Sequence, residues 1–291
     1  MHIQEGTQNP NAAIVDRWWP KTNTFHLPFG EMSITLEDVS MLLKIPVMGK
    51  VVNYPSISRD ESIELIVRAL QVSEKKADKH LNKYQKVLKS WLKSRWGDLP
   101  KLSNKYKEKR QVFPVVECTT RAYMWYLLGC TLFVDKTSTL VPVELLALVE
   151  NLEEVHTYTY GAAALAYLYR QLGSATRVNV CQIHGYLTLL EGWVYDHFNV
   201  VLHEARRAQL MLGTLSVDRE SRALNINRRA LDSTRSNKVT WDPYSSLRTD
   251  DDFAELAFYT GTINFFGIVE PHHPDRFLKQ LGHVQRIPSS P

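Results

Sequence analysis

The run from Asp16 to Val39 constrains the fold of this chain more than any other part of its sequence. Two short segments of alternating polarity, Thr24 to Leu27 and Met32 to Thr35, flank Pro28-Phe29-Gly30. This arrangement predicts a small β-hairpin. The threonine that ends the second segment lies three residues before Asp38, a spacing typical of a helix N-cap. The run therefore predicts a scaffold of aromatic anchors, a tight turn, a strand pair and a capped helix.

Helical periodicity dominates the rest of the chain, so the expected fold class is mainly α. We expect a single compact helical domain, with the small N-terminal β-hairpin and a short β segment near the C-terminus. The helices are expected at 12–19, 36–43, 58–72, 79–96, 119–134, 143–152, 160–172, 183–201 and 275–280, and the β segment at 263–269. Gly173 is expected to cap the helix at 160–172.

The expected domain runs from residue 12 to residue 288, with flexible ends at 1–11 and 289–291. An irregular, Arg-rich insertion is expected at about 204–240, where the helical pattern weakens.

Composition indicates an ordinary globular protein: of 291 residues, 44% are hydrophobic and 10% aromatic. The three cysteines, Cys118, Cys130 and Cys181, are odd in number and widely spaced. They fit buried free thiols in a reducing compartment better than a disulfide framework. The longest apolar run, Ala122 to Val134, is too short to span a bilayer, and the N-terminus lacks a signal-peptide pattern. These features predict a nuclear or cytoplasmic protein that does not associate with a membrane.

Positive charge is concentrated between Lys75 and Arg110, where thirteen Lys or Arg face three acids. Such an excess attracts polyanions or an acidic partner surface. Within the expected helix at 79–96, four lysines recur at helical spacing and would form a basic face able to contact phosphates. They are Lys83, Lys86, Lys89 and Lys93. A solvated helix face is the alternative interpretation.

The sequence contains no recognisable catalytic motif: no G-x-S-x-G, no phosphate-binding loop, no dinucleotide fingerprint and no H-E-x-x-H. His272 and His273 are adjacent, so their side chains would diverge in extended backbone and could not easily share one metal ion. Trp18 and Trp19 could stack on bases, although the favoured interpretation is one core tryptophan and one that partly covers the surface. An unrecognised enzyme remains a third alternative, which a deep pocket of converging His and carboxylate groups would support.

Three ordered blocks of the sequence resemble the plant mobile domain family, and within it the Maintenance of Meristems-like proteins. The family-pattern residues that we single out are Arg17, Trp18, Pro20, Phe25, His26, Pro28, Gly30, Glu31, Arg121, Tyr123, Gly129, Arg170, Trp193, Trp241, His272, Asp275 and Arg276. They are expected to have structural roles. The chain departs from the pattern at Trp19, Lys21, Lys44, Pro271 and His273, which puts any shared partner surface near Pro271 in doubt.

The resemblance implies a mostly helical nuclear protein that acts in meristem maintenance, genome stability and transposable-element silencing. It also implies a nuclear protein partner that resembles a Ser/Thr phosphatase. Although the family is sometimes labelled aminotransferase-like, no lysine stands in a recognisable pyridoxal context, so no cofactor is expected. The leading hypothesis is a non-enzymatic interaction module. The alternative is a transposon-derived nucleic-acid-binding protein that uses the basic helix at 79–96.

Overall fold

The computed structural model describes residues 11–97, 112–134, 139–176, 185–198, 219–248 and 256–287. The chain divides into two compact units, of which the first comprises Met1–Val47 with Gly161–Pro291 and the second comprises Met48–Tyr160. The second unit is thus inserted in sequence between the two segments of the first. The described part is mainly helical, with small strand pairs near both ends, in agreement with the expected fold class. The prediction of one compact domain stays a prediction.

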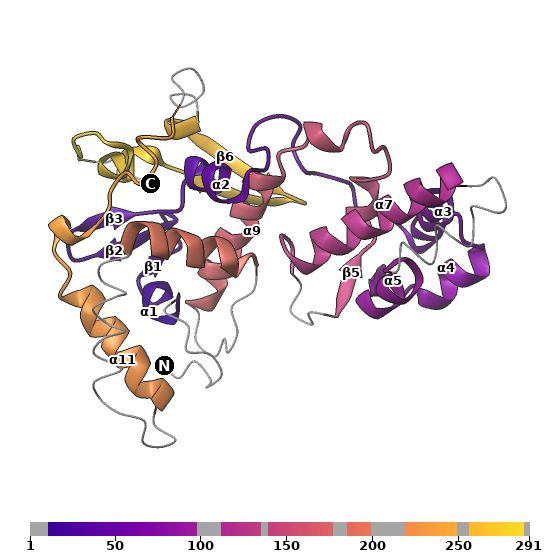
Figure 1. Ribbon diagram of the computed structural model, residues 1–291, viewed down its shortest axis with the longest axis horizontal. Helices are drawn as coiled ribbons and strands as arrows, with labels where there is room; N and C mark the ends of the chain where they lie inside the picture. Colours follow the sequence, from indigo (N-terminus) through magenta and orange to yellow (C-terminus); the bar gives the residue numbers. More distant parts are fainter. Residues whose placement is uncertain are drawn as a thin grey trace. The chain divides into compact units, whose positions relative to one another are not determined.

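The first unit contains two small antiparallel sheets and several helices (Figure 1). Its helices are α1 (Asn11–Val15), α2 (Leu36–Leu43), α9 (Tyr160–Ala175), an unlabelled helix at 187–198, and α11 (Arg219–Asp232). Its 3-10 turns are η2 (Ser236–Lys238), η3 (Pro274–Arg276) and η4 (Leu278–Leu281). Its strands are β1 (Trp18–Trp19), β2 (Thr24–Leu27), β3 (Gly30–Met32), β6 (Gly261–Phe265) and β7 (Ile268–His272).

The N-terminal sheet has the order β1-β2-β3, so the expected hairpin gains a third strand. Phe25 pairs with Met32 on one side and with Trp18 on the other. The expected helix at 12–19 is wrong in its second half, because α1 ends at Val15 and the two tryptophans form β1. In the strand, Trp18 is 3% exposed and Trp19 is 49% exposed, which confirms one core and one surface tryptophan.

Helix α2 starts with a complete capping box, as the spacing of Thr35 and Asp38 predicts. Thr35 Oγ1 accepts from Asp38 N at 3.0 Å, and Thr35 N donates to Asp38 Oδ2 at 2.7 Å. The helix ends where Lys44 adopts a left-handed conformation, with φ of 54°. The cap holds the Asp38 carboxylate against the unit interior, where other segments reach it.

Helix α9 runs through Gly173, so the expected cap at that residue is wrong. A Cβ at Gly173 would lie 3.4 Å from Pro20 Cβ. Gly173 therefore lies within the helix, beside the residue that follows β1, and does not end the helix.

Three expectations for the later part of the chain need correction. Within the expected irregular insertion at 204–240, residues 219–232 form helix α11, which Arg17 joins through an ion pair with Asp232; residues 204–218 lie outside the described residues. The expected β segment at 263–269 is a hairpin of β6 and β7 turned at Phe266 and Gly267, both with positive φ. The expected helix at 275–280 is two 3-10 turns, η3 and η4.

The second unit is built from helices around one two-stranded sheet. Its elements are α3 (Arg59–Leu70), α4 (Glu74–His80), β4 (Lys86–Leu88), α5 (Lys89–Trp96), α7 (Val112–Cys130), β5 (Leu140–Pro142), α8 (Glu144–Ala147) and η1 (Val155–Thr157). Helix α3 confirms the helix expected at 58–72, with Ser58 as its N-cap. Helix α7 begins earlier than expected, whereas the helix expected at 143–152 is only the single turn α8.

The expected basic helix at 79–96 is wrong. Helix α4 ends at His80, a turn follows, and β4 pairs with β5 before α5 begins. The side chain of Asn82 makes this turn, because its Oδ1 accepts from Tyr84 N at 2.8 Å and from Lys86 N at 3.0 Å. The four lysines therefore do not share one helix face.

Candidate functional site

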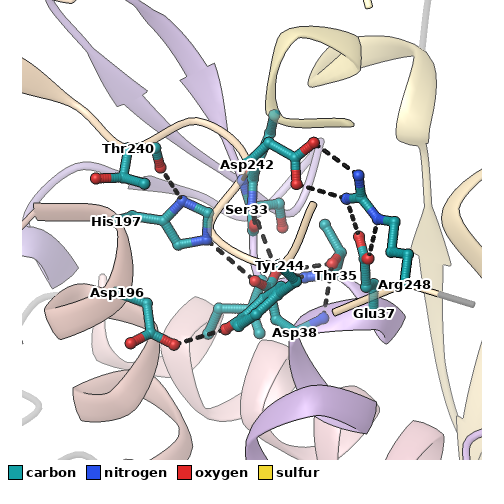
Figure 2. Close-up of polar contacts among 12 residues, drawn as sticks. Ser33, Thr35, Glu37, Asp38, Asp196, His197, Thr240, Asp242, Tyr244 and Arg248 are labelled. Carbon is teal, nitrogen blue, oxygen red and sulfur yellow. Dashed lines mark hydrogen bonds and ion pairs between the residues drawn. The ribbon is translucent and has the colours of Figure 1, made fainter. Parts of the chain in front are cut away.

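The first unit contains a polar network whose centre, Asp38 with His197, is buried (Figure 2). We call it the Asp38 network, and its members are Ser33, Thr35, Glu37, Asp38, Tyr169, Asp196, His197, Thr240, Asp242, Tyr244, Arg248 and Gln280. They come from the β3–α2 connection, α2, α9, the helix at 187–198, the segment 240–248 and η4. The network thus joins parts of the chain that are far apart in sequence.

Asp38 accepts hydrogen bonds with both carboxylate oxygens. Thr35 Oγ1 donates to Oδ2 at 2.7 Å, and Gln280 Nε2 reaches the same oxygen at 3.3 Å. His197 Nε2 lies 3.0 Å from Oδ1. The side chains of Asp38 and His197 are 3% and 1% exposed, so water does not compete for these contacts.

His197 faces an acceptor with each ring nitrogen. Its Nδ1 lies 2.8 Å from the carbonyl oxygen of Thr240. A carbonyl oxygen only accepts, so Nδ1 carries a proton and donates it to this bond. His197 therefore connects the helix at 187–198 to α2 through Asp38 and to the segment 240–248 through Thr240.

Arg248 lies between two carboxylates (Figure 2). Its Nε and Nη2 donate to Glu37 at 2.6 and 2.9 Å, and its Nη1 and Nη2 donate to Asp242, both at 2.6 Å. Burial raises the pKa of Glu37 despite the opposing effect of the guanidinium. Bidentate pairing of this kind fixes the orientation of the side chains and also pairs opposite charges.

Tyr244 adds another connection from the same segment. Its hydroxyl donates to Asp196 Oδ2 at 2.8 Å, and burial raises the pKa of Tyr244 well above its usual value. The phenol therefore stays protonated and remains a donor. The segment 240–248 is thus fastened at Thr240, Asp242, Tyr244 and Arg248.

Gln280 and Tyr169 extend the network to Ser33. Gln280 Oε1 accepts from Ser33 N at 3.1 Å, and its Nε2 donates to Ser33 O at 2.7 Å. The hydroxyls of Tyr169 and Ser33 lie 2.8 Å apart. An amide that pairs with both backbone groups of one residue behaves like an added strand partner, so η4 is held against the end of β3.

His272 is a buried titratable group at the edge of this network. Its Nδ1 lies 3.5 Å from the Tyr169 hydroxyl, and its Nε2 makes no hydrogen bond to any described residue. Burial, followed by the charge of His273, lowers the pKa of His272 to about 4. The ring is therefore neutral at physiological pH.

The contacts of the Asp38 network hold distant segments of the first unit together. Its strongest donors and acceptors face one another, and the histidine and carboxylate at its centre are buried. Among the described residues, no group of three His, Cys, Asp or Glu side chains lies close enough to hold a metal ion. Within the same ranges, the structure has no helix of the length and apolarity that a membrane crossing requires.

Most family-pattern residues of the first unit connect its segments. Arg276 pairs with Glu31 at 2.9 Å, Arg170 with Glu270 at 2.8 Å, and Arg17 with Asp232. These ion pairs join β3 to η3, α9 to β7, and the α1–β1 connection to α11. Asp275 lies in η3, where its carbonyl oxygen accepts from Gln285 Nε2 at 2.8 Å.

The aromatic family-pattern residues form the core beside β2. The ring of Phe25 stacks on Trp193 at 5.0 Å and meets Trp18 edge-on at 4.7 Å. Trp241 lies outside this group, where Lys279 Nζ is 4.1 Å from its ring centre. His26 is exposed and stacks on Trp19, while Pro20, Pro28 and Gly30 lie exposed in turns or at strand ends.

Three family-pattern residues lie in the second unit. Arg121 Nε donates to Glu150 O at 2.8 Å, and a Cβ at Gly129 would come within 2.5 Å of Val141 Cγ1. The first therefore joins α7 to the residues after α8, and the second allows α7 to pack on β5. Tyr123 is exposed on α7.

Sequence reasoning did not identify the centre of the Asp38 network. The sequence marks Asp38 only as part of a helix cap. It carries no local signal for His197, Glu37 or Arg248. Asp38 and His197 are 159 residues apart, and nothing local marks either as the partner of the other. Of the three cysteines, Cys181 lies outside the described residues.

Comparison with known proteins gives a consistent result. The sequence model described as plant mobile domain matches residues 7–291. Protein MAIN-LIKE 1 of Arabidopsis thaliana is 36% identical over 285 residues, which cover 95% of this chain and 54% of that protein. Protein MAINTENANCE OF MERISTEMS of the same plant is 35% identical over 289 residues, covering 95% and 57%.

A third relative has a longer chain. The Serine/threonine-protein phosphatase 7 long form homolog of Arabidopsis thaliana is 29% identical over 317 residues, covering 96% of this chain and 22% of that protein. This chain spans about half the length of the first two relatives. No solved structure matches it.

Proposed function

The chain belongs to the plant mobile domain family, as its three sequence blocks predicted, and from this we propose that it is a non-enzymatic protein-interaction module of the nucleus. It holds a phosphatase-like partner in a complex that silences transposable elements and maintains genome stability and the meristem.

The observation that carries this proposal is the burial of the Asp38 network. Asp38 and His197 are the central residues that could act as acid, base or electrostatic catalyst. They instead bind each other in the interior. A general acid or base has to reach the atom whose proton it moves. Side chains held in this way instead fix the positions of distant chain segments, which is what a binding scaffold needs.

The named relatives support the biological setting. One is named for the maintenance of meristems, and another carries the name of a serine/threonine-protein phosphatase. A similar sequence therefore occurs in a chain with a phosphatase name, which favours a phosphatase-like partner for this chain.

Affinity purification tests the proposal. The tagged chain is expressed in plant cells and recovered from nuclei with and without nuclease, and bound proteins are identified by mass spectrometry. We expect a phosphatase-like protein that survives nuclease treatment. The Asp38→Ala variant should lose it because the scaffold is loosened, whereas Asp78→Ala, an exposed carboxylate in the second unit, should retain it.

Two outcomes would count against the proposal. Recovery of no specific nuclear protein would remove the interaction role. Recovery only of proteins that nuclease releases would favour the nucleic-acid alternative, although its continuous basic helix is absent and only separate lysines remain.

A further inference from the structure

The outward face of the small sheet in the second unit is largely apolar, with Leu88, Leu140 and Pro142 beside Lys86. Val87 and Val141 are opposite each other in the register and have no exposed surface, so their side of the sheet faces the interior. Neighbouring residues of a strand point to opposite sides. Leu88 therefore faces outward, where it is 48% exposed, and Leu140 is its partner across the two strands.

The turn before β4 places an aromatic ring next to this face in sequence. Tyr84 is 63% exposed, and Lys83 Nζ lies 4.9 Å from its ring centre. The Asn82 side chain holds the turn through the two hydrogen bonds described above, and Gln85 completes it with φ of 52°. These contacts give the backbone that carries Tyr84 a defined turn.

Positive charge surrounds this apolar surface along the chain. Residues 74–97 contain eight Lys or Arg and two acids, Glu74 and Asp78. Asp78 already pairs with Arg59, whose Nη2 lies 2.6 Å from Asp78 Oδ1. Lys83 precedes β4, and Lys93 lies one turn into α5 after it; both are exposed.

This combination of groups has one complementary ligand chemistry. Lysines attract carboxylates. Covering an exposed leucine and tyrosine with aliphatic side chains lowers the free energy of the complex. Nucleic acid fits less well, because the lysines are distributed over a turn, a strand and a helix. Among the described residues of 74–97, Tyr84 is also the one exposed aromatic ring, whereas single strands stack successive bases on several ring faces.

We propose that the outward face of β4–β5, with Tyr84 and the lysines around it, binds an acidic, leucine-containing segment of a partner protein. The proposal rests on the interaction role proposed above and names the chemistry of the partner.

Fluorescence anisotropy with the full chain tests this. The probes are a labelled synthetic peptide in which leucines are flanked by glutamates, the same peptide with serine for each leucine, and a short DNA duplex. We expect the leucine peptide to bind about tenfold more tightly than the serine peptide, because leucine burial contributes to its affinity. Its binding should weaken as sodium chloride increases.

Two variants and their matched controls locate the site. Leu88→Ser should remove the difference between the two peptides, whereas Val269→Ser, an exposed valine on β7, should preserve it. Lys83→Glu with Lys93→Glu should weaken both peptides about tenfold through like-charge repulsion, while Lys21→Glu with Lys44→Glu should change little.

Equal affinity for the two peptides, an unchanged preference in Leu88→Ser, or tighter binding of the duplex than of the leucine peptide would overturn the inference. Purification of Leu88→Ser from plant nuclei separates it from the wider proposal. If the wild type and the variant recover the same partner, the interaction role stands and this face is not its site. If the wild type recovers no partner, the interaction role itself fails.

Discussion

The two units differ in where they keep their charged groups. In the first unit, Asp38 and Glu37 are buried and meet a histidine and an arginine that are also largely buried. In the second unit, the ion pairs of Arg59 and Arg68 with Asp78 and Glu150 lie at the surface. Buried pairs are costly to break because one charge is left without solvent, whereas exposed pairs contribute little. The first unit should therefore be the more sensitive to loss of a single charge and to pH.

Removing the Asp38 carboxylate tests this difference most directly. Asp38→Ala leaves His197, Gln280 and the α2 cap without their acceptor, and loss of one partner of a buried pair costs about 3–5 kcal/mol. Urea unfolding measures the free energy, with Asp78→Ala as the exposed control, for which about 0–1 kcal/mol is expected. Equal losses of unfolding free energy in the two variants would show that the two units do not differ in their sensitivity to the loss of a charge.

Acid should act on the first unit through His272. Its pKa is about 4 in the folded protein and about 6.5 in the unfolded chain, so the unfolded state takes up the proton first as pH falls. The stability that depends on a neutral His272 is complete above pH 6.5 and is lost as pH falls to 4. The loss is about 3 kcal/mol, at 1.36 kcal/mol for each pH unit.

Unfolding of the wild type and of His272→Phe at several pH values isolates this contribution, because phenylalanine keeps a ring but does not titrate. As pH falls, the free energy of unfolding of the wild type should decrease relative to that of the variant. A difference in this free energy that stays constant between pH 7 and 4 would mean that His272 is not buried as described.

The second unit should be more sensitive to packing than to charge. Gly129→Ala places a methyl group within 2.5 Å of Val141 Cγ1, and overpacking of this kind costs about 1–3 kcal/mol. Thermal unfolding should show a lowered midpoint, whereas Tyr123→Ala on the exposed side of α7 should leave it nearly unchanged. A stable Gly129→Ala protein would show that α7 and β5 separate easily.

The smallest effect is expected for the exposed pair of Arg68 and Glu150. A double-mutant cycle with alanine at both positions should give a coupling energy of about 0–1 kcal/mol, falling as salt increases. A coupling energy comparable to the loss in Asp38→Ala would show that this surface pair is as important as the buried one.

Local signals in the sequence predicted local structure well. The hairpin around Pro28-Phe29-Gly30, the cap of α2 and helix α3 follow from residues that lie within a few positions of one another. The helix expected at 79–96 failed because β4 depends on β5, some fifty residues later, and that pairing leaves no trace in the periodicity of lysines.

The candidate site was predictable only in part. The ion pairs made by Arg17, Arg170 and Arg276 involve residues that the family pattern marks, but their partners are set by the tertiary fold. For the Asp38 network, only the helix cap was visible. A carboxylate in a capping box has the same sequence signal whether it faces water or a buried histidine from the other end of the chain.

The discontinuity of the first unit has a consequence for synthesis on the ribosome. Residues 48–160 are continuous, so the second unit can fold as soon as they have emerged. Glu37 and Asp38 emerge earlier but have their full set of partners only when His197, Arg248 and Gln280 have all been made. Until then the N-terminal segment is exposed to proteases and chaperones. A nascent chain stalled before residue 240 should therefore be cut within 11–47 while residues 48–97 are protected.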